Sequence, residues 1–285
     1  MKAAEQLSQF RCRNLTLDLS SPKIMGILNA TPDSFSDGGL FFSVDSALDQ
    51  IGKMVTEKAS IIDIGGESTR PGSDPVSEQE EIDRVLPIFE KAVNEFPEII
   101  FSVDTTKYEV ARLALEAGAQ MINDVSGLQK EPRLMELAAT HHAAYVLMHS
   151  QGDPKSMQKN PSYRNVIDDI RTFFELQLKH AEKHGVTSVL LDPGIGFGKT
   201  LEHNLELIAR LKEFNSIGYP LLVGASRKSM ISTLLDGRPA DDRLHGTLAI
   251  HYHCLMNSAK VIRVHDVKAA ADTIAIFNAV HKFEN

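Results

Sequence analysis

The stretch SVLLDPGIGFGKT, residues 188–200, decides the fold, because it shows the unit from which the chain is built. An apolar run ends in an acid and a glycine-rich turn. Residues 202–214 (EHNLELIARLKEF) then place apolar side chains at the three- and four-residue spacing of an amphipathic helix. A fully apolar run of this kind is expected of a parallel strand that is buried on both faces. The stretch therefore predicts one strand–turn–helix unit.

The tail of this stretch, Gly198-Lys199-Thr200, also resembles the end of an ATP-binding P-loop. A P-loop needs a glycine five places before the Gly-Lys pair, so that successive backbone N–H groups surround a phosphate. Pro193 occupies that place and has no N–H to donate. We therefore interpret Asp192 as the functional group of the stretch and its glycines as a tight turn.

The same unit recurs along the whole chain. Eight short apolar runs end in polar or glycine-rich turns: KIMGILN (23–29), SIIDIGG (60–66), IIFSVDT (99–105), MINDVSG (121–127), AAYVLMH (143–149), SVLLDPG (188–194), PLLVGAS (220–226) and VIRVHDV (261–267). Helical patterns such as EIDRVLPIFEKAVNEF (81–96) lie between them. Strict alternation of this kind is typical of a (β/α)8 TIM barrel. A doubly wound sheet is the structural alternative, but it usually has fewer strands and a clear dinucleotide fingerprint.

The domain organisation follows from the absence of breaks in this pattern. No linker, low-complexity tract or further repeat divides the sequence. We therefore expect one α/β domain over residues 1–285, with RNLTLDLS (13–20) as a short N-terminal β extension.

Composition restricts the class of protein. A net charge of −8 argues against non-specific binding of nucleic acid, which needs a broad basic face. No apolar run approaches the roughly 18 residues that would span a bilayer. The two cysteines, Cys12 and Cys254, cannot form a disulfide framework, and the opening MKAAEQLSQF lacks the apolar core of a signal peptide. We therefore expect a cytoplasmic protein without membrane or nucleic-acid partners.

Polar residues gather where the predicted strands end. In a barrel the C-terminal ends of the strands converge on one mouth, where active sites are built. Each residue singly could be a helix cap, but residues from eight strands have no common capping role. They are Asn29, Asp63, Asp104, Asn123, Asp124, His149, Asp192, Ser226, Lys228, Arg263 and His265.

Two of the predicted β–α connections, residues 29–43 and 65–79, exceed the usual length of about 2–6 residues. Long connections at the catalytic face are usually binding loops, although an unstructured insertion is the alternative. Phe35 is an isolated aromatic residue among turn formers, and Arg70 is followed by Pro71, which stiffens its backbone. We therefore expect both loops to contribute to binding.

The residue types at the mouth suggest a substrate with two different ends. Carboxylates and amides can pair with a flat heterocycle that presents adjacent N–H donors, as an aminopyrimidinone does. Arginine, lysine and histidine can hold phosphate oxygens. Asn29 offers a neutral oxygen to a hard ion such as Mg²⁺, which normally shares its site with phosphate. These groups suggest a displacement in which diphosphate departs.

The chain closely resembles the bacterial dihydropteroate synthase family from Ile24 to Val267. MGILNATPDSFSDGG (25–39) and DIGGESTRPGS (63–73) match the two long signatures of the family, and both are highly specific. Five shorter blocks agree in order and spacing: SVDTTK (102–107), INDVSG (122–127), LDPGIGFGK (191–199), GASRKSM (224–230) and RVHDV (263–267). Ile195 departs from the pattern, since many members have phenylalanine there.

The resemblance implies transfer of the 6-methylene-dihydropterin from its diphosphate ester to 4-aminobenzoate, through a dissociative mechanism, by a homodimer that uses Mg²⁺. It implies that Asp104, Asn123, Asp192, Lys228 and Met148 bind the pterin. It places Asn29, Thr69, Arg70, Arg263 and His265 at the diphosphate, with Asn29 also on the metal. It places Phe35, Thr69, Pro71, Phe197 and Ser226 at 4-aminobenzoate. Lys228, Arg263, His265 and Asp104 would carry the catalysis.

Three alternatives remain at this point. A methyltetrahydrofolate methyltransferase would share the acid-and-amide pterin site, but it would not need the SRK and RVHD blocks or the long loops. A non-catalytic pterin-binding paralogue would be marked by loss of Asn29, Arg263 or His265, which are all present. A regulatory barrel without pterin would not explain the loops.

Overall fold

Eight parallel strands close into a barrel in the computed structural model, which describes residues 9–31, 43–68, 73–152, 157–158 and 160–283. The strands follow one another around the barrel in chain order, and β10 closes the ring by pairing with both β3 and β9. Their bounds are β3 Lys23–Asn29, β4 Ile61–Gly65, β5 Ile100–Asp104, β6 Met121–Asp124, β7 Ala144–Met148, β8 Val189–Asp192, β9 Leu221–Val223 and β10 Ala259–Val264. Each of the predicted apolar runs forms one of these strands, so the predicted barrel is confirmed and a doubly wound sheet is excluded.

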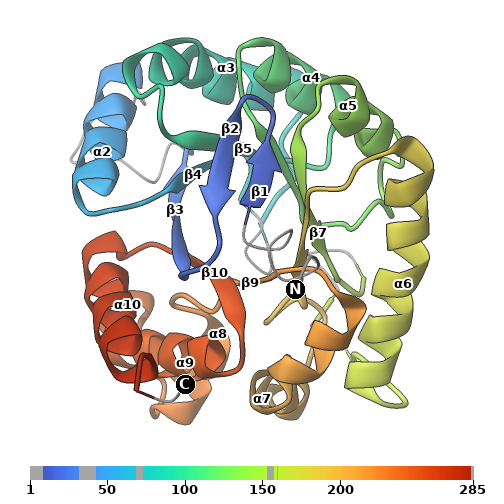
Figure 1. Cartoon of the computed structure of the whole chain (residues 1–285), viewed down its shortest axis with the longest axis vertical. Helices are drawn as coiled ribbons and strands as arrows, with labels where there is room; N and C mark the ends of the chain where they lie inside the picture. The colour runs from blue at the N-terminus through green and yellow to red at the C-terminus, as the bar shows by residue number, and fades with distance from the viewer. Residues whose placement is uncertain (1–8, 32–42, 69–72, 153–156, 159, 284–285) are drawn as a thin grey trace.

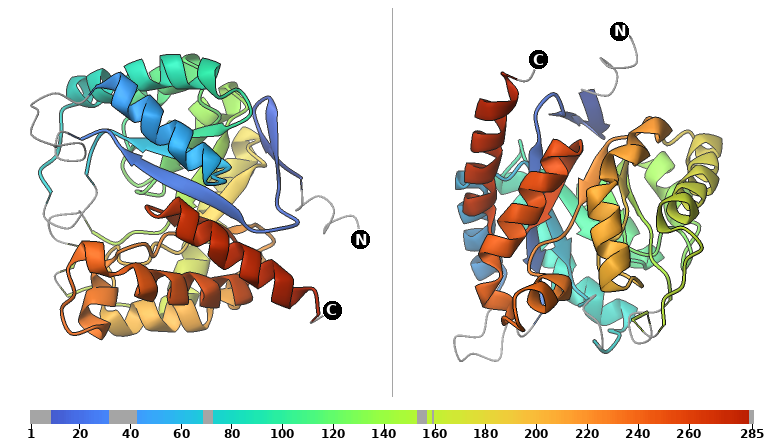
Figure 2. Two further views of the ribbon diagram at one scale, coloured as in Figure 1. Left: turned by 90° about the vertical axis from the view of Figure 1, so that its left-hand side faces the viewer. Right: turned by 90° about the horizontal axis from the view of Figure 1, so that it is seen from below.

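Helices surround the strands on the outside (Figures 1 and 2). Within the described residues they are α2 Val44–Thr56, α3 Glu78–Glu95, α4 Tyr108–Glu116, α5 Leu134–Thr140, α6 Val166–His184, α7 Leu201–Ala209, α8 Ser229–Leu234, α9 Leu244–Met256 and α10 Val267–His281. Short 3₁₀ segments run over η2 Leu211–Ile217 and η3 Ala240–Asp242. None of the described helices is both long and apolar enough to cross a membrane.

The predicted helix at 202–214 is interrupted in the structure. The α-helical part, α7, ends at Ala209, and the chain tightens into η2 after Arg210. Arg210 lies at the break and forms ion pairs with Glu206 in α7 and with Glu213 in η2. These two pairs connect the helix to the 3₁₀ segment. The apolar face continues across the break, since Leu207, Leu211 and Phe214 are all buried.

The N-terminal extension is a hairpin that closes one end of the barrel (Figure 1; Figure 2, left). Strands β1 (Gln9–Cys12) and β2 (Leu15–Asp18) pair in antiparallel fashion, and their buried side chains pack against the first residues of the barrel strands. The predicted extension contains β2 but misses β1, because four residues of alternating exposure give too short a pattern. Since the hairpin occupies the N-terminal end of the barrel, the opposite end is left for a site.

Candidate active site

The register of the strands decides which side chains enter the barrel mouth. Side chains alternate between the two sides of a strand. The first inward positions are apolar and pack with the hairpin, as Met25, Ile100 and Val261 do. Steps of two from such positions lead to the residues that line the mouth: Asn29, Asp63, Asp104, Asn123, Met148, Asp192 and Arg263. Asp63 is the third of five residues in β4, so it lies deeper than the strand end that the sequence indicates.

A buried cluster of ionic and polar groups forms the floor of this mouth. Arg263 donates from Nε to Asp63 Oδ2 and from Nη2 to Asp104 Oδ2, both at 2.6 Å. Asn123 Nδ2 donates to the same oxygen of Asp63 at 2.8 Å. The cluster joins β4, β5, β6 and β10, and its carboxylates are almost fully buried. One guanidinium therefore orients two acids for whatever occupies the mouth.

Two acceptor atoms in the cluster lack a partner among the described residues. Asp63 Oδ1 and Asp104 Oδ1 are buried and accept no hydrogen bond there. Burial raises the pKa of Asp104 to about 7, with Arg263 acting against the shift and Asp63 adding to it. Burial alone would lower the pKa of Arg263, but the two carboxylates outweigh it and hold that pKa above its ordinary value. The mouth thus presents unsatisfied oxygens that suit a ligand with N–H donors.

The glycine-rich turn after β8 carries the next group of polar atoms. Asp192 Oδ1 accepts a hydrogen bond from the Gly194 N–H at 2.7 Å, while burial raises the pKa of this acid. Lys228 Nζ donates to the Ile195 carbonyl and lies 4.0 Å from the centre of the Phe197 ring. Burial lowers the pKa of Lys228 to about 7, against the attraction of Asp192. Asp192, Lys228 and Phe197 therefore meet at one side of the mouth.

His265 and Ser226 lie together after the neighbouring strands β10 and β9. Ser226 Oγ is 3.0 Å from His265 Nδ1 and also accepts a hydrogen bond from the His265 backbone N–H at 3.2 Å. Met148, the last residue of β7, is buried and supplies an apolar wall. The structure thus brings together the predicted site residues on β5 to β10 and on the turns that follow them.

Asn29 offers one side-chain oxygen that could serve as a ligand of a metal ion. It ends β3, is half-buried, and makes no side-chain hydrogen bond to any described residue. In the described part of the chain, no three His, Cys, Asp or Glu side chains form a group that could hold a metal by themselves. Mg²⁺ normally binds through one or two protein oxygens, waters and substrate phosphates, so a single amide oxygen fits this mode. Phe35, Thr69, Arg70 and Pro71 lie outside the described residues.

Lys199 and Thr200, the residues that resemble the end of a P-loop, bond within the turn after β8 and to the helix that follows it. The Lys199 side chain is buried against the turn, where Nζ lies 3.0 Å from His149 Nδ1 and donates to the Phe197 carbonyl at 3.0 Å. Burial lowers the pKa of Lys199 to about 7. Thr200 caps α7 in a reciprocal pair with His203. These residues hold their own turn, which agrees with the absence of a P-loop.

Asp124 lies beside this site but faces away from it. It has the opposite register to Asn123 and accepts hydrogen bonds from Ser126 N and Oγ, Leu128 N and Tyr145 Oη at 2.6–2.8 Å. Burial raises its pKa despite these donors. Asp124 is therefore a structural acid that shapes the turn after β6.

The variant Asp124→Ala is expected to lower the free energy of unfolding by about 3 kcal/mol, because several buried donors lose their acceptor at once. The urea midpoint at constant m-value measures this loss. A midpoint equal to that of the unmodified protein would show that the turn does not depend on Asp124.

Comparison with known proteins places this geometry in a family. The family model described as pterin binding enzyme matches residues 25–265. The chain is 48% identical to dihydropteroate synthase from Haemophilus influenzae over 268 residues, which cover 93% of this chain and 96% of the relative. It is 47% identical to dihydropteroate synthase from Escherichia coli over 266 residues, which cover 93% of each chain.

Solved structures agree with the sequence comparison. The crystal structure of dihydropteroate synthase from Yersinia pestis with a sulfonamide drug complex superposes with a TM-score of 0.90 at 46% identity, covering 96% of this chain and 99% of the other. The enzyme from Xanthomonas albilineans with 4-aminobenzoic acid superposes with a TM-score of 0.90 at 38% identity, covering 96% and 98%.

Proposed function

The chain belongs to the family of pterin binding enzymes, and on that premise we propose that it catalyses the dihydropteroate synthase reaction. It is a transferase that condenses (7,8-dihydropterin-6-yl)methyl diphosphate with 4-aminobenzoate, giving 7,8-dihydropteroate and diphosphate. The observation that carries the proposal is the cluster in the barrel mouth, in which Asp63 and Asp104 keep buried oxygens without a partner among the described residues.

The buried acids match one edge of the pterin. An aminopyrimidinone ring presents adjacent N–H donors, and Asp63 Oδ1 and Asp104 Oδ1 are acceptors of the required kind. We assign Asn123 to the same edge, since its amide is held by Asp63. Lys228 supplies a donor for the ring carbonyl, and Met148 supplies an apolar wall. The pterin is therefore fixed by groups on five different strands or turns.

We assign the diphosphate leaving group to the cationic side chains of the mouth. The bond between the methylene carbon and the diphosphate oxygen breaks, and the electron pair departs with diphosphate. The amine of 4-aminobenzoate then forms the C–N bond and releases a proton. An arylamine is neutral at pH 7, so it needs no general base before it attacks. We place Arg263 and His265 at the departing charge, where one preorganised donor contributes about 3–4 kcal/mol.

Mg²⁺ would be held by Asn29 together with oxygens of the diphosphate. When bound, the ion neutralises part of the diphosphate charge. This role, and the assembly of the chain as a homodimer, are proposals that rest on the family resemblance. Exposed apolar side chains on α10, Ile276 and Val280, are compatible with such an assembly.

One incubation tests the proposed function. The protein is mixed with the pterin diphosphate, 4-aminobenzoate and Mg²⁺, and both products are separated and quantified by mass spectrometry and a phosphate assay. Equal amounts of dihydropteroate and diphosphate are the expected result. Release of diphosphate without dihydropteroate would contradict the proposal, because the amine would then not be the acceptor.

The lowered pKa of Lys228 leads us to expect that pterin binding depends on pH. Because its pKa is lowered to about 7, Lys228 is charged below pH 7 and neutral above it. If the charged form holds the ring carbonyl, the affinity for the pterin diphosphate falls as the pH rises through 7. Calorimetric titration from pH 6 to 8.5 measures the trend, at roughly two- to tenfold over this range for one charge-assisted hydrogen bond.

The variant Lys228→Met separates this lysine from its neighbours. Asp104 and Lys199 titrate in the same range and remain in the variant. The difference between the two pH profiles therefore reports the charge on Lys228, including its effect on the pKa of Lys199. Parallel profiles, displaced only by a constant factor, would show that the proton on Lys228 does not matter to the pterin.

A further inference from the structure

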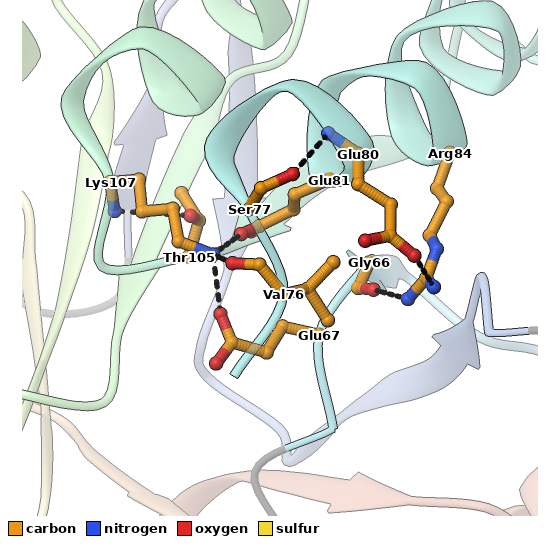
Figure 3. A network of polar contacts seen from close by, with 9 residues as sticks. All are labelled: Gly66, Glu67, Val76, Ser77, Glu80, Glu81, Arg84, Thr105 and Lys107. Carbon is orange, nitrogen blue, oxygen red and sulfur yellow. Dashed lines mark hydrogen bonds and ion pairs between the residues drawn. The ribbon is translucent and has the colours of Figure 1, made fainter. Parts of the chain in front are cut away.

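Lys107 joins three segments that lie next to the proposed site (Figure 3). It follows β5 and Asp104 by three residues and begins α4 as its N-cap. Its Nζ donates to Glu67 Oε2 at 2.5 Å, to the Val76 carbonyl at 2.8 Å and to Glu81 Oε2. Its side chain is largely buried, with 21% exposed. A single ammonium thus uses all of its three donors on defined partners.

Two of these partners are the two ends of one connection. Glu67 comes shortly after β4, and Val76 comes just before Ser77, the N-cap of α3. Between them runs the segment 68–75, which contains Thr69, Arg70 and Pro71. The ammonium of Lys107 therefore ties the point where this segment leaves the barrel to the point where it returns.

Other contacts also hold the two ends of this connection in place. Arg84 Nη1 donates to the Gly66 carbonyl at 2.7 Å. A side chain at Gly66 would bring a Cβ within 2.9 Å of both Glu81 Cγ and Val85 Cγ1, so the chain is pressed against α3 at that point. Ser73 Oγ donates to the Ser68 carbonyl at 2.5 Å, across the connection itself. Several specific contacts therefore fix the two ends of the connection.

Charge neutralisation alone does not account for the arrangement. The Glu81 side chain is 1% exposed, and burial raises its pKa while the hydrogen bond from Lys107 opposes the rise. A lysine that only balanced Glu81 would need no bond to Glu67 or to a neutral backbone carbonyl. The bond to Val76 therefore points to a positional role.

We propose that Lys107 is a positioning residue for the second substrate: it holds Glu67 and Val76, the two ends of the β4–α3 connection, in fixed positions relative to Asp104, and binding of 4-aminobenzoate depends on that placement. The inference rests on the proposed function. Because Lys107 leads directly back to β5, one residue links the pterin acid and the connection that serves the other substrate. A displacement of about 1 Å at such a position can lower activity by roughly 100-fold.

Steady-state kinetics of Lys107→Met test the proposal. The KM for 4-aminobenzoate is expected to rise about tenfold or more, while the KM for the pterin diphosphate changes less than about twofold. Lys107→Arg, which keeps the charge and several donors, should recover part of the loss. Lys91→Met is the matched control, because Lys91 forms an exposed pair with Asp45 on the outer side of α3. Equal rises in both KM values would overturn the proposal, since they would report general damage.

Glu67→Gln guards against a folding defect in the first variant. It removes the charge at one end of the connection and leaves the buried Lys107–Glu81 pair in place. Its KM for 4-aminobenzoate should rise in the same direction by a smaller factor. An unchanged KM in both folded variants would sink the proposal.

Hydrogen exchange separates this inference from the proposed function. In Lys107→Met, amide exchange of the peptide spanning 66–77 should accelerate about tenfold, while peptides from α3 keep their protection. Unaltered exchange in residues 66–77 would refute the positioning role of Lys107, whether or not the protein makes dihydropteroate. Failure of the unmodified protein to form product, with accelerated exchange in the variant, would refute only the proposed function.

Discussion

Replacement of Arg263 by lysine is expected to lower kcat/KM for the pterin diphosphate by about 100-fold or more, although the positive charge is kept. In the structure, Nε and Nη2 of Arg263 each hold a different carboxylate at 2.6 Å. An ammonium on a flexible stem cannot reproduce this forked geometry. One buried acid loses its charged partner, and the remaining one is no longer held in the same orientation.

The same residue is proposed to face the leaving group. Arg263 Nη1 makes no hydrogen bond or ion pair to any described residue, so it is the atom that can contact the diphosphate. Lysine offers no third nitrogen for this contact. The loss should therefore appear in kcat as well as in KM, since an interaction that strengthens as the diphosphate departs acts mainly in the transition state.

Arg112→Lys is the matched control for this experiment. Arg112 also bonds two carboxylates, Glu109 and Glu116, but on the exposed surface of α4. Surface pairs of this kind contribute little, so kcat/KM should be unchanged. Thermal melting establishes that both variants are folded. A value for Arg263→Lys within about threefold of the unmodified enzyme would contradict the role assigned to the guanidinium.

The barrel was predictable because its signal is repeated and local. Each apolar run is long enough to be recognised as a buried strand, and strict alternation with helices leaves few topologies. The boundaries of the predicted runs agree with those of the eight strands to within three residues. The first hairpin strand was missed because Gln9–Cys12 is short, and its partners in the barrel interior are distant in sequence.

The site was only partly predictable, for two physical reasons. Because barrel strands are apolar on both sides, the sequence does not reveal which register faces inward, and Asn123 and Asp124 looked equivalent. The structure separates them, since only Asn123 contacts Asp63 while Asp124 bonds Tyr145 in the outer layer. The pairing of Asp63 with Arg263, 200 residues apart, has no local signal either. Lys107 was likewise visible only as part of a signature block.

Asp104→Ala is expected to weaken binding of the pterin diphosphate by about 100-fold or more while the fold is retained. The variant removes Asp104 Oδ1, a buried acceptor with no partner among the described residues, together with the charge beside Arg263. Hydrogen bonds to a charged group contribute about 1.5–3 kcal/mol each, so the loss of a carboxylate accounts for a change of this size. Calorimetry with the pterin diphosphate measures it, and undiminished affinity would rule out Asp104 as the anchor.

The stability of the same variant distinguishes a binding acid from a structural one. Burial raises the pKa of Asp104 from 3.8 to about 7, so the folded state holds its proton more tightly than the unfolded state does. As the pH rises from about 4 to about 7, the folded state therefore loses stability relative to the unfolded state. Asp104→Ala removes this pH-dependent contribution, so the stability of the variant should decline less over that range than that of the unmodified protein.

Asp124→Ala should instead be less stable than the unmodified protein, because four hydrogen bonds lose their acceptor. Urea midpoints at pH 5 and pH 7.5 compare the two, and a loss of stability in Asp104→Ala as large as that in Asp124→Ala would mean that Asp104 serves the fold rather than the substrate.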